Sequence, residues 1–333
     1  MPRNFVWPSE LREAGILGIN RRNLDYILRS NPRRHYPRVD NKLITKKFCE
    51  EHGIPVPETY GVLRSHGEIS RFPEIVSTHS DFVVKPACGA AGRGVLVIAE
   101  RVGDVYVKPG GRSLHWNEVR YYLSTVISGL HSLGARLDYA IIEQRIVTHP
   151  TLDKVSVEGT PDVRVILYRG VPVMAMLRLP THASGGRANL HQGAIAAAVN
   201  LGSGRTYGGV CQNRVVDRHP DTHEPIAGIA LPDWRGLLDA AMRLGDALEL
   251  GYLGVDFVID AQLGPVVLEA NARPGLAIQV ANRTGLWPRL AEIEKLPPER
   301  VQGDARWALI DELSRPEPGA NESGLPPPDY AVK

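Results

Sequence analysis

The sequence is poor in cysteine and has no long apolar run. Its 333 residues include three cysteines, Cys49, Cys88 and Cys211, which are odd in number and far apart. We therefore expect no disulfide framework and favour a reducing compartment. The longest purely apolar run, 194–199, has six residues, whereas a membrane-spanning helix needs about 20. The N-terminus has no apolar core followed by small residues, so we expect no secretion signal, no membrane span and a cytoplasmic protein.

An excess of charge of one sign is also missing. Lys and Arg number 39 against 37 Asp and Glu, which gives a net charge of +2. The basic residues are scattered along the chain, so a nucleic acid is not expected as the main partner. A hydrophobic content of 43% with 33 glycines and 26 prolines indicates a globular, loop-rich protein. The length exceeds that of one compact core, which favours two or three domains.

Apolar periodicity predicts strands and helices without strict alternation, which is typical of an α+β protein. We expect helices over 40–52, 117–130 and 233–250, strands over 82–84, 95–98, 140–142 and 193–201, and hairpins over 163–177 and 253–270. Residues 1–40 are basic and irregular in pattern. Residues 315–333 contain five prolines and no bulky apolar run, which predicts a flexible tail.

The last hairpin carries two carboxylates and an amide on one face. We expect Asp260 to pair with Pro265 across a four-residue turn. Asp256 then lies opposite Glu269, and Asn271 points to the same face. Facing carboxylates in apolar strands repel each other, and a divalent cation removes that repulsion. Oxygen-only ligands suit Mg²⁺ or Mn²⁺ rather than Zn²⁺. The alternative is a solvated outer face, which is the interpretation that we favour for Asp260 alone.

A lysine at a strand end precedes a glycine-rich loop. Lys85 ends the apolar run 82–84, and Gly89, Gly92 and Gly94 follow it. Glycines let backbone N–H groups approach a phosphate closely, and the lysine adds a positive charge. A strand follows the loop, and the spacing matches neither a dinucleotide fingerprint nor a P-loop. A plain hairpin turn is the alternative, but the lysine favours phosphate binding.

Four signals occur in a characteristic order along the chain. They are a helix beginning at Lys42, Lys85 with its glycine loop, the strand that runs into 143–146, and the hairpin from Asp256 to Asn271. This order resembles the ATP-grasp superfamily of carboxylate–amine ligases. The stretches 189–193 and 269–275 resemble the branch of the ribosomal-protein glutamate ligases. Within that branch, the alpha-L-glutamate ligase-like proteins are the most similar, from about residue 15 to residue 290.

The resemblance implies a nucleotide site built from several segments. Lys42 and Lys85 would bind phosphates under a flap formed by residues 88–94. The Gln144 carbonyl and the Ile146 N–H would contact the adenine, with Glu143 beside them. In the same way, Asp162 is implied as the acid that holds the ribose hydroxyls.

The resemblance also implies a metal and substrate site. The Mg²⁺ ligands would be Asp256, Glu269 and Asn271. Six further residues would face the transferred phosphate and the acid substrate, namely Arg178, Arg187 and Arg273 as catalytic groups and Asn189, His191 and Gly275 as substrate-binding groups. Arg164 is not among them, and a surface position in its hairpin is the alternative considered for it.

The implied fold is α+β, with two ATP-grasp subdomains clasping ATP. We expect an N-terminal helical or linker segment (1–80), a small subdomain with the glycine loop (81–147), a large subdomain with the metal and substrate site (148–314) and the tail (315–333). Only about 40 residues precede Lys42, so a short segment stands in place of the usual preceding domain. The segment Asn20–Asn23, or a partner protein, would then complete the acid or amine site.

The implied activity is ATP-dependent amide formation through an acyl phosphate, with release of ADP and phosphate. Glutamate or a similar amino acid would be the acid, and a small molecule, peptide or protein the amine acceptor. One alternative is an ATP-binding regulatory or scaffold protein without ligase activity, and another is phosphoryl transfer without amide formation. The sequence does not identify the acid and the amine, and it leaves open whether the chain forms a homo-oligomer.

Overall fold

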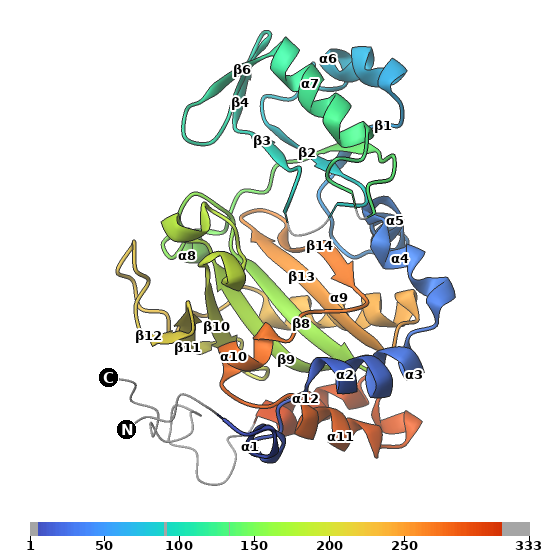
Figure 1. Ribbon diagram of the computed structural model, residues 1–333, viewed down its shortest axis with the longest axis vertical. Coiled ribbons are helices and arrows are strands. Elements are labelled where there is room, and N and C mark those ends of the chain that lie inside the picture. Colours follow the sequence, from blue (N-terminus) through green and yellow to red (C-terminus); the bar gives the residue numbers. More distant parts are fainter. Residues whose placement is uncertain (1–5, 90–91, 133, 315–333) are drawn as a thin grey trace.

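The protein has two lobes, each built around its own sheet (Figure 1). The computed structural model describes residues 6–89, 92–132 and 134–314. The tail predicted for 315–333 lies outside these ranges. None of the helices in the described ranges combines the length and the apolar character that crossing a membrane requires.

The smaller lobe, at the top of Figure 1, is a four-stranded antiparallel sheet covered by a helix. Its strands, in spatial order, are β1 (Thr59–Leu63), β7 (Ala140–Glu143), β2 (Phe82–Pro86) and β3 (Leu96–Ile98). Further elements are η3 (His66–Arg71), α6 (Phe72–Ile75), and a small sheet of β4 (Glu100–Val102), β5 (Val105–Val107) and β6 (Ser113–His115). The helix α7 (Trp116–Ile127) buries Val119, Leu123 and Val126 against this core, as the apolar spacing predicts.

The larger lobe is a seven-stranded antiparallel sheet between helices. Its strands, in spatial order, are β12 (Arg214–Val216), β11 (Thr206–Cys211), β10 (Ile195–Val199), β9 (Val171–Leu179), β8 (Asp162–Tyr168), β13 (Tyr252–Asp260) and β14 (Gly264–Asn271). The surrounding helices are α8 (Pro150–Asp153), α9 (Trp234–Leu248), α10 (Ala277–Asn282), α11 (Trp287–Glu294) and α12 (Ala305–Ser314), with short turns η4 (His182–Ser184), η5 (Leu190–Gln192) and η6 (Pro298–Arg300).

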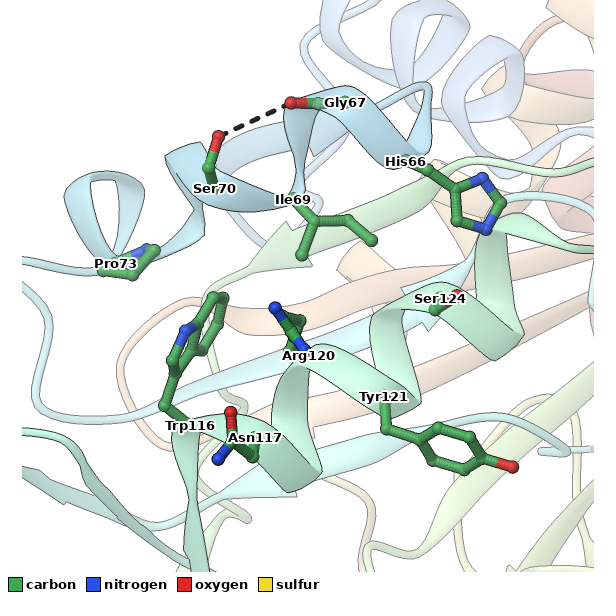
Figure 2. Close-up of a pocket in the computed structure, with 10 residues that line it drawn as sticks. All are labelled: His66, Gly67, Ile69, Ser70, Pro73, Trp116, Asn117, Arg120, Tyr121 and Ser124. Atoms are coloured by element: carbon green, nitrogen blue, oxygen red, sulfur yellow. Dashed lines mark hydrogen bonds between the residues drawn. The ribbon is translucent and has the colours of Figure 1, made fainter.

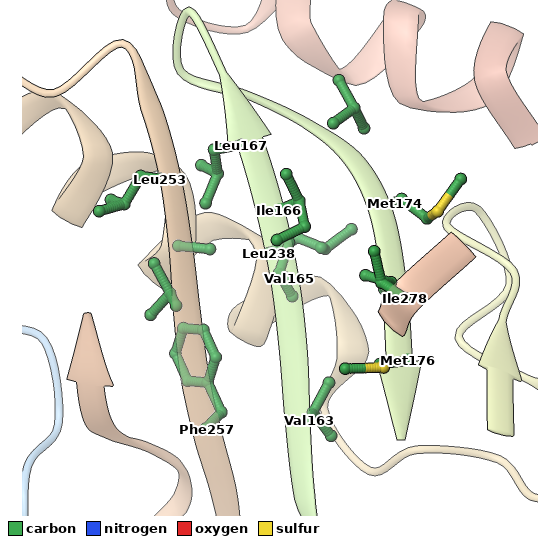
Figure 3. Close-up of a cluster of buried hydrophobic side chains, with 14 of the residues drawn as sticks. Val163, Val165, Ile166, Leu167, Met174, Met176, Leu238, Leu253, Phe257 and Ile278 are labelled. Carbon is green, nitrogen blue, oxygen red and sulfur yellow. The ribbon is translucent and has the colours of Figure 1, made fainter. Parts of the chain in front are cut away.

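The helix α9 shows how the sequence builds this core. Asp233 caps its N-terminus by accepting a hydrogen bond from the Gly236 N–H at 3.2 Å. Leu237, Leu238, Ala241, Leu244 and Leu248 recur at helical spacing, and all are buried. Figure 3 shows Leu238 within the cluster formed by β8, β9, β13 and α10. The helix expected over 233–250 is therefore present and faces the sheet.

The N-terminal segment is helical rather than irregular over its described residues. It forms α1 (Pro8–Glu13), α2 (Ile19–Arg21), η1 (Arg22–Ile27), α3 (Leu28–Ser30), η2 (Arg33–His35), α4 (Pro37–Asp40) and α5 (Lys42–Glu51). Its apolar residues Leu17, Tyr26 and Val39 belong to the core of the larger lobe. Asn31 fixes the segment, because its side chain donates to the carbonyls of Tyr252 and Ala272. The subdomain boundaries expected from the sequence remain a prediction.

The β13–β14 hairpin contains a bulge. Its turn pairs Asp260 with Gly264, not with Pro265 as we expect from the sequence. An extra residue in β14 then shifts the register between Asp256 and Phe257. Beyond the bulge Asp256 lies opposite Glu269 as expected, but only because the extra residue in β14 compensates for the one-residue difference at the turn.

Two stretches of chain connect the lobes, and both are attached to this hairpin. The first passes Pro55, whose carbonyl accepts a hydrogen bond from the Val267 N–H at 3.0 Å. The second passes Val147, whose N–H donates to Asp260 Oδ2 at 2.9 Å. Asp260 Oδ1 also accepts from the N–H groups of Gln262 and Leu263. Asp260 is 3% exposed, so the solvated position that we favour for it is wrong: its carboxylate is buried because it has three backbone donors.

Candidate functional site

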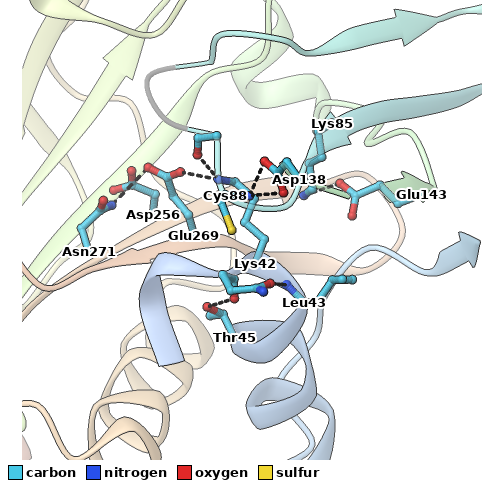
Figure 4. A network of polar contacts seen from close by, with 12 residues as sticks. Lys42, Leu43, Thr45, Lys85, Cys88, Asp138, Glu143, Asp256, Glu269 and Asn271 are labelled. Atoms are coloured by element: carbon cyan, nitrogen blue, oxygen red, sulfur yellow. Dashed lines mark hydrogen bonds and ion pairs between the residues drawn. The ribbon is translucent and has the colours of Figure 1, made fainter. Parts of the chain in front are cut away.

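The polar face of the β13–β14 hairpin lies at the junction of the lobes (Figure 4). Asp256 and Glu269 are cross-strand partners, and Asn271 lies on the same face. The Asn271 side chain donates to Glu269 Oε1 at 3.1 Å. Asp256 is 2% exposed, whereas the Glu269 side chain is 28% exposed. The structure thus brings together the three residues expected to hold a metal, with Glu269 the more accessible carboxylate.

Lys42 connects this hairpin to the glycine loop. It begins α5, whose N-terminus is capped by Asn41 through a 2.9 Å hydrogen bond from the Leu43 N–H. Lys42 Nζ donates to the Gly89 carbonyl at 2.5 Å and lies 3.6 Å from Glu269 Oε2 (Figure 4). The ammonium is therefore placed between the loop and the hairpin, although the two are distant in sequence.

Lys85 is buried at the end of β2 and pairs with Glu143 on the neighbouring strand β7. The other oxygen of Glu143 pairs with Lys46 Nζ at 2.8 Å, and Lys46 also donates to the Pro57 carbonyl at 2.6 Å. Our sequence analysis missed Lys46. Its signal is the spacing of four from Lys42 on α5, which places both lysines on one side of the helix.

The described part of the glycine loop is held at both ends. The Cys88 N–H donates to the buried carboxylate of Asp138 at 3.0 and 3.1 Å, and Gly89 forms a bridge with Ser132. At the other end the Tyr122 hydroxyl donates to the Gly94 carbonyl. Asp138 is a second residue that the sequence analysis missed, because nothing in the sequence places it beside the loop.

At two of these glycines the surrounding atoms leave no room for a Cβ atom. A Cβ at Gly89 would lie 2.2 Å from Pro86 Cγ. At Gly94, where φ is +71°, a Cβ would lie 2.5 Å from His131. Gly92 has a positive φ of 67° and no atom near its Cβ position. Residues 90 and 91 of the expected flap lie outside the described residues.

The segment after β7 presents free backbone groups. The Gln144 N–H donates to the Glu58 carbonyl at 2.8 Å, which fixes the segment against the other connection between the lobes. Among the described residues, the Gln144 carbonyl and the Ile146 N–H have no hydrogen-bond partner. This unpaired acceptor and donor are the groups expected to contact an adenine edge.

Four charged side chains form a buried network across β9, β8 and β13. Arg178 lies opposite Asp162, and Arg164 lies opposite Asp256. Arg178 also donates to Asp256 Oδ2 at 3.0 Å, which joins the two pairs. The Arg164 side chain is only 13% exposed, so the surface position considered for it is wrong.

This network, which we call the tetrad, has two negative and two positive charges. Burial raises the pKa of Asp162, and Arg178 opposes that effect. Burial also acts to raise the pKa of Asp256, but Arg164 and Arg178 outweigh it and hold that pKa below its usual range. The carboxylate expected to hold a ribose is thus bound by Arg178 in this structure, through two hydrogen bonds.

The remaining expected residues fall into two groups. Asn189 caps the turn η5 by accepting from the His191 N–H at 3.0 Å, and both Arg187 and His191 are exposed. Arg273 and Gly275 are exposed just beyond β14, and the Arg273 guanidinium lies over the Tyr36 ring at 5.2 Å. Within the described residues, no hydrogen bond or ion pair joins the loop 187–191 to the polar hairpin face.

The N-terminal segment reaches the end of the polar hairpin. Arg22 donates to the Pro274 carbonyl at 2.7 Å. Burial lowers the pKa of Arg22, and the nearby Arg273 acts in the same direction. The segment Asn20–Asn23, which we expect to help build the acid site, therefore lies next to the residues that follow Asn271.

The donor set of the hairpin fits a hard divalent cation. Two carboxylates and one amide supply oxygen atoms only, as Mg²⁺ prefers. No cluster of three or more His, Cys, Asp or Glu side chains suited to a metal occurs in the described ranges, and the third expected donor is the Asn271 amide. In this structure the Asp256 oxygens accept from Arg164 and Arg178.

A pocket of about 560 Å³ lies elsewhere, on the outside of the smaller lobe between η3 and α7 (Figure 2). Its lining includes His66, Trp116 and Arg120, and it contains none of the expected site residues. Trp116 stacks on the buried Phe72, with ring centroids 5.8 Å apart. The pocket is therefore separate from the junction of the lobes.

Comparison with known proteins defines the class. The family described as sugar-transfer associated ATP-grasp matches residues 21–295. The chain belongs to this family, and its fold is the α+β ATP-grasp fold. The expected ATP-grasp superfamily is thus confirmed, but the family that matches is not the glutamate ligase-like branch. No curated protein sequence matches the chain.

Solved structures similar to the chain include two ligases and one synthetase. The ATP-grasp ligase PsnB with a minimal precursor has 16% identity and a TM-score of 0.39, over 85% of this chain and 62% of that one. D-cycloserine synthetase DcsG has 14% identity and a TM-score of 0.44, over 81% of this chain and 73% of that one. D-alanine–D-alanine ligase from Bacillus anthracis, complexed with ATP, has 16% identity and a TM-score of 0.40, over 83% of this chain and 64% of that one. The chain thus spans about three fifths of the length of PsnB.

Proposed function

We propose that this protein is an ATP-dependent ligase that joins a carboxylate to an amine and releases ADP and phosphate. The observation that carries the proposal is the position of Lys42, whose ammonium contacts both the glycine loop at Gly89 and the carboxylate of Glu269. A phosphate chain placed under the loop would then lie between this ammonium and the oxygen donors of the hairpin.

Each group has a task in this proposal. Lys42, Lys85 and the loop amides neutralise charge on the phosphates, and the free backbone groups of Gln144 and Ile146 bind the base. Asp162 is the proposed ribose acid, which requires Arg178 to release one of its oxygens. Asp256, Glu269 and Asn271 would hold Mg²⁺, which supplies electrostatic stabilisation of the phosphoryl oxygens when bound.

The reaction needs no covalent enzyme nucleophile. The substrate carboxylate attacks the γ-phosphate in line, which forms an acyl phosphate and releases ADP. The amine then attacks the acyl carbon, and the C–O bond to phosphate breaks. Exclusion of water by the loop would protect the acyl phosphate from hydrolysis.

The acid would bind beside the metal ligands. Arg273 follows Asn271 by two residues, and Arg22 is hydrogen bonded to the backbone at Pro274. Two guanidinium groups near one another suit a carboxylate, because the planar fork binds both oxygens. Five further residues are proposed to contribute to the same side of the site: Arg178, Arg187, Asn189, His191 and Gly275. The family match does not indicate glutamate as the acid, so we propose a carboxylate substrate without naming it.

An ADP-release screen over pairs of acids and amines tests the proposal. We expect ADP release that requires Mg²⁺ and at least one acid, and loss of that release in Glu269→Gln with ATP binding and fold retained. Hydroxylamine added with the acid should trap a hydroxamate, because only an acyl phosphate yields one. Arg273→Ala should lose rate while it keeps ATP binding. ATP binding without any acid-dependent ADP release would instead favour a regulatory or scaffold role.

A further inference from the structure

A buried cluster of three charges lies at the junction of the lobes, on the side opposite the polar hairpin. It consists of Lys46 on α5, Lys85 on β2 and Glu143 on β7, and we call it the triad. The side chains are 7%, 8% and 4% exposed, respectively. Each oxygen of Glu143 pairs with a different ammonium, Oε2 with Lys46 at 2.8 Å and Oε1 with Lys85. Both oxygens of Glu143 therefore face an ammonium group, and neither is left for a ligand.

The triad has one more positive than negative charge. Burial lowers the pKa of Lys46 while Glu143 acts to raise it, and the exposed Glu50 acts weakly in the same direction as Glu143. An excess charge in a buried site is costly unless a further anion offsets it. The Lys46 ammonium is also hydrogen bonded to the Pro57 carbonyl at 2.6 Å, so two of its three N–H donors already have protein acceptors.

We propose that Lys46 is a positioning residue for the nucleotide phosphates: by sharing Glu143, it leaves Lys85 with positive charge that the phosphate chain offsets. This inference rests on the proposed function. Without Lys46, Glu143 and Lys85 form a neutral pair, and a phosphate must compete with a carboxylate for one ammonium. With Lys46, the carboxylate has a second cation, and the cluster as a whole attracts an anion.

The test is calorimetric titration of the full chain with Mg·ATP. Lys46→Gln removes the charge but keeps a hydrogen-bond donor for Pro57. We expect it to weaken ATP binding roughly tenfold, the size of one unit charge acting over about 10 Å in a protein interior. The matched control is Lys47→Gln, one position along the same helix, where the side chain is 74% exposed and pairs only with Glu51. The control should bind ATP as the wild type does.

The double variant Lys46→Gln/Glu143→Gln separates charge from packing. It leaves Lys85 as the only charge, so the net charge returns to that of the wild type, and ATP binding should recover towards the wild-type value. Wild-type affinity in Lys46→Gln, or a double variant that binds no more tightly than Lys46→Gln, would overturn the inference. If Lys46→Gln does not fold, Glu143→Gln, which has one positive charge more than the wild type, must bind ATP roughly tenfold more tightly than the wild type, and equal affinities overturn the inference. A wild type that does not bind Mg·ATP overturns the proposed function itself, which is a different result.

Discussion

The two buried charge clusters of this protein differ in balance. The triad at the junction of the lobes has two lysines for one glutamate, whereas the tetrad of the larger lobe has two arginines for two aspartates. The triad therefore has one excess positive charge that an anionic ligand can offset, whereas the positive and negative charges of the tetrad balance each other. The comparison teaches that removing one charge should have opposite consequences in the two clusters: loss of a lysine leaves a neutral pair in the triad, but loss of Asp256 leaves an unpaired buried cation in the tetrad.

The largest effect is expected for Lys85→Met. The variant should lower the rate of ADP release by about 1,000-fold, because one of the two ammonium groups proposed to neutralise the phosphates is lost. Its thermal unfolding temperature should stay close to that of the wild type, since Glu143 keeps Lys46 as a partner. The measurement is a coupled ADP assay beside a thermal melt. A variant that is inactive because it is unfolded would contradict the comparison.

The next largest effect is a loss of stability, which we expect for Asp256→Asn. Arg164 then loses its carboxylate, and we expect a loss of about 3 kcal/mol in the free energy of unfolding. Urea denaturation at neutral pH measures it, with Lys85→Met as the reference for a cluster that tolerates the change. Equal stability of the two variants would show that charge balance does not distinguish the lobes.

The same variant has an expected pH signature. The folded pKa of Asp256 is held below its unfolded value near 3.8 by Arg164 and Arg178. Its contribution to stability is thus present above about pH 4 and is lost as the pH falls towards the folded pKa. Urea denaturation between pH 5 and pH 3 should show a smaller acid-induced loss in Asp256→Asn than in the wild type. An identical loss in both would mean that Asp256 is not the group that titrates.

The smallest effect is expected at the partly exposed pair Arg145–Asp81. The two side chains are 30% and 35% exposed, with Arg145 Nε 2.8 Å from Asp81 Oδ2. A double-mutant cycle with Arg145→Ala and Asp81→Ala should give a coupling of about 0.5 kcal/mol or less, because solvent screens the pair. A coupling as large as that in the tetrad would show that burial is not what separates these clusters.

The sequence was enough to predict the helices and strands with strong apolar periodicity, and it also predicted that Asp256 and Glu269 lie opposite each other. It could not predict the bulges. In the β8–β9 hairpin, which turns at Arg169 and Gly170, a simple extension of the ladder from the turn would pair Asp162 with Leu177. A shift of register between Ile166 and Leu167 brings Arg178 opposite Asp162 instead. Alternation carries no signal for an inserted residue, so the tetrad could not be assembled from the sequence.

Lys46 was missed for a different reason. Lys46 and Lys47 are adjacent on a helix, and both are compatible with a solvated face. Only the position of β7 shows that one of them meets Glu143 and the other meets water. The individual helices before Lys42 were not predicted, although a helical or linker segment was expected there, because each has six residues or fewer, too short for a periodic pattern to appear.

The attachment of both inter-lobe connections to the β13–β14 hairpin limits how the lobes move. Pro55 is held by β14, and Val147 is held by Asp260 at the end of β13. Rotation of the smaller lobe must therefore bend the chain at 56–58 and 144–146, two stretches joined by the hydrogen bond between Gln144 and Glu58. The proposed adenine contacts lie at this pivot, so an occupied base site would fix the angle between the lobes.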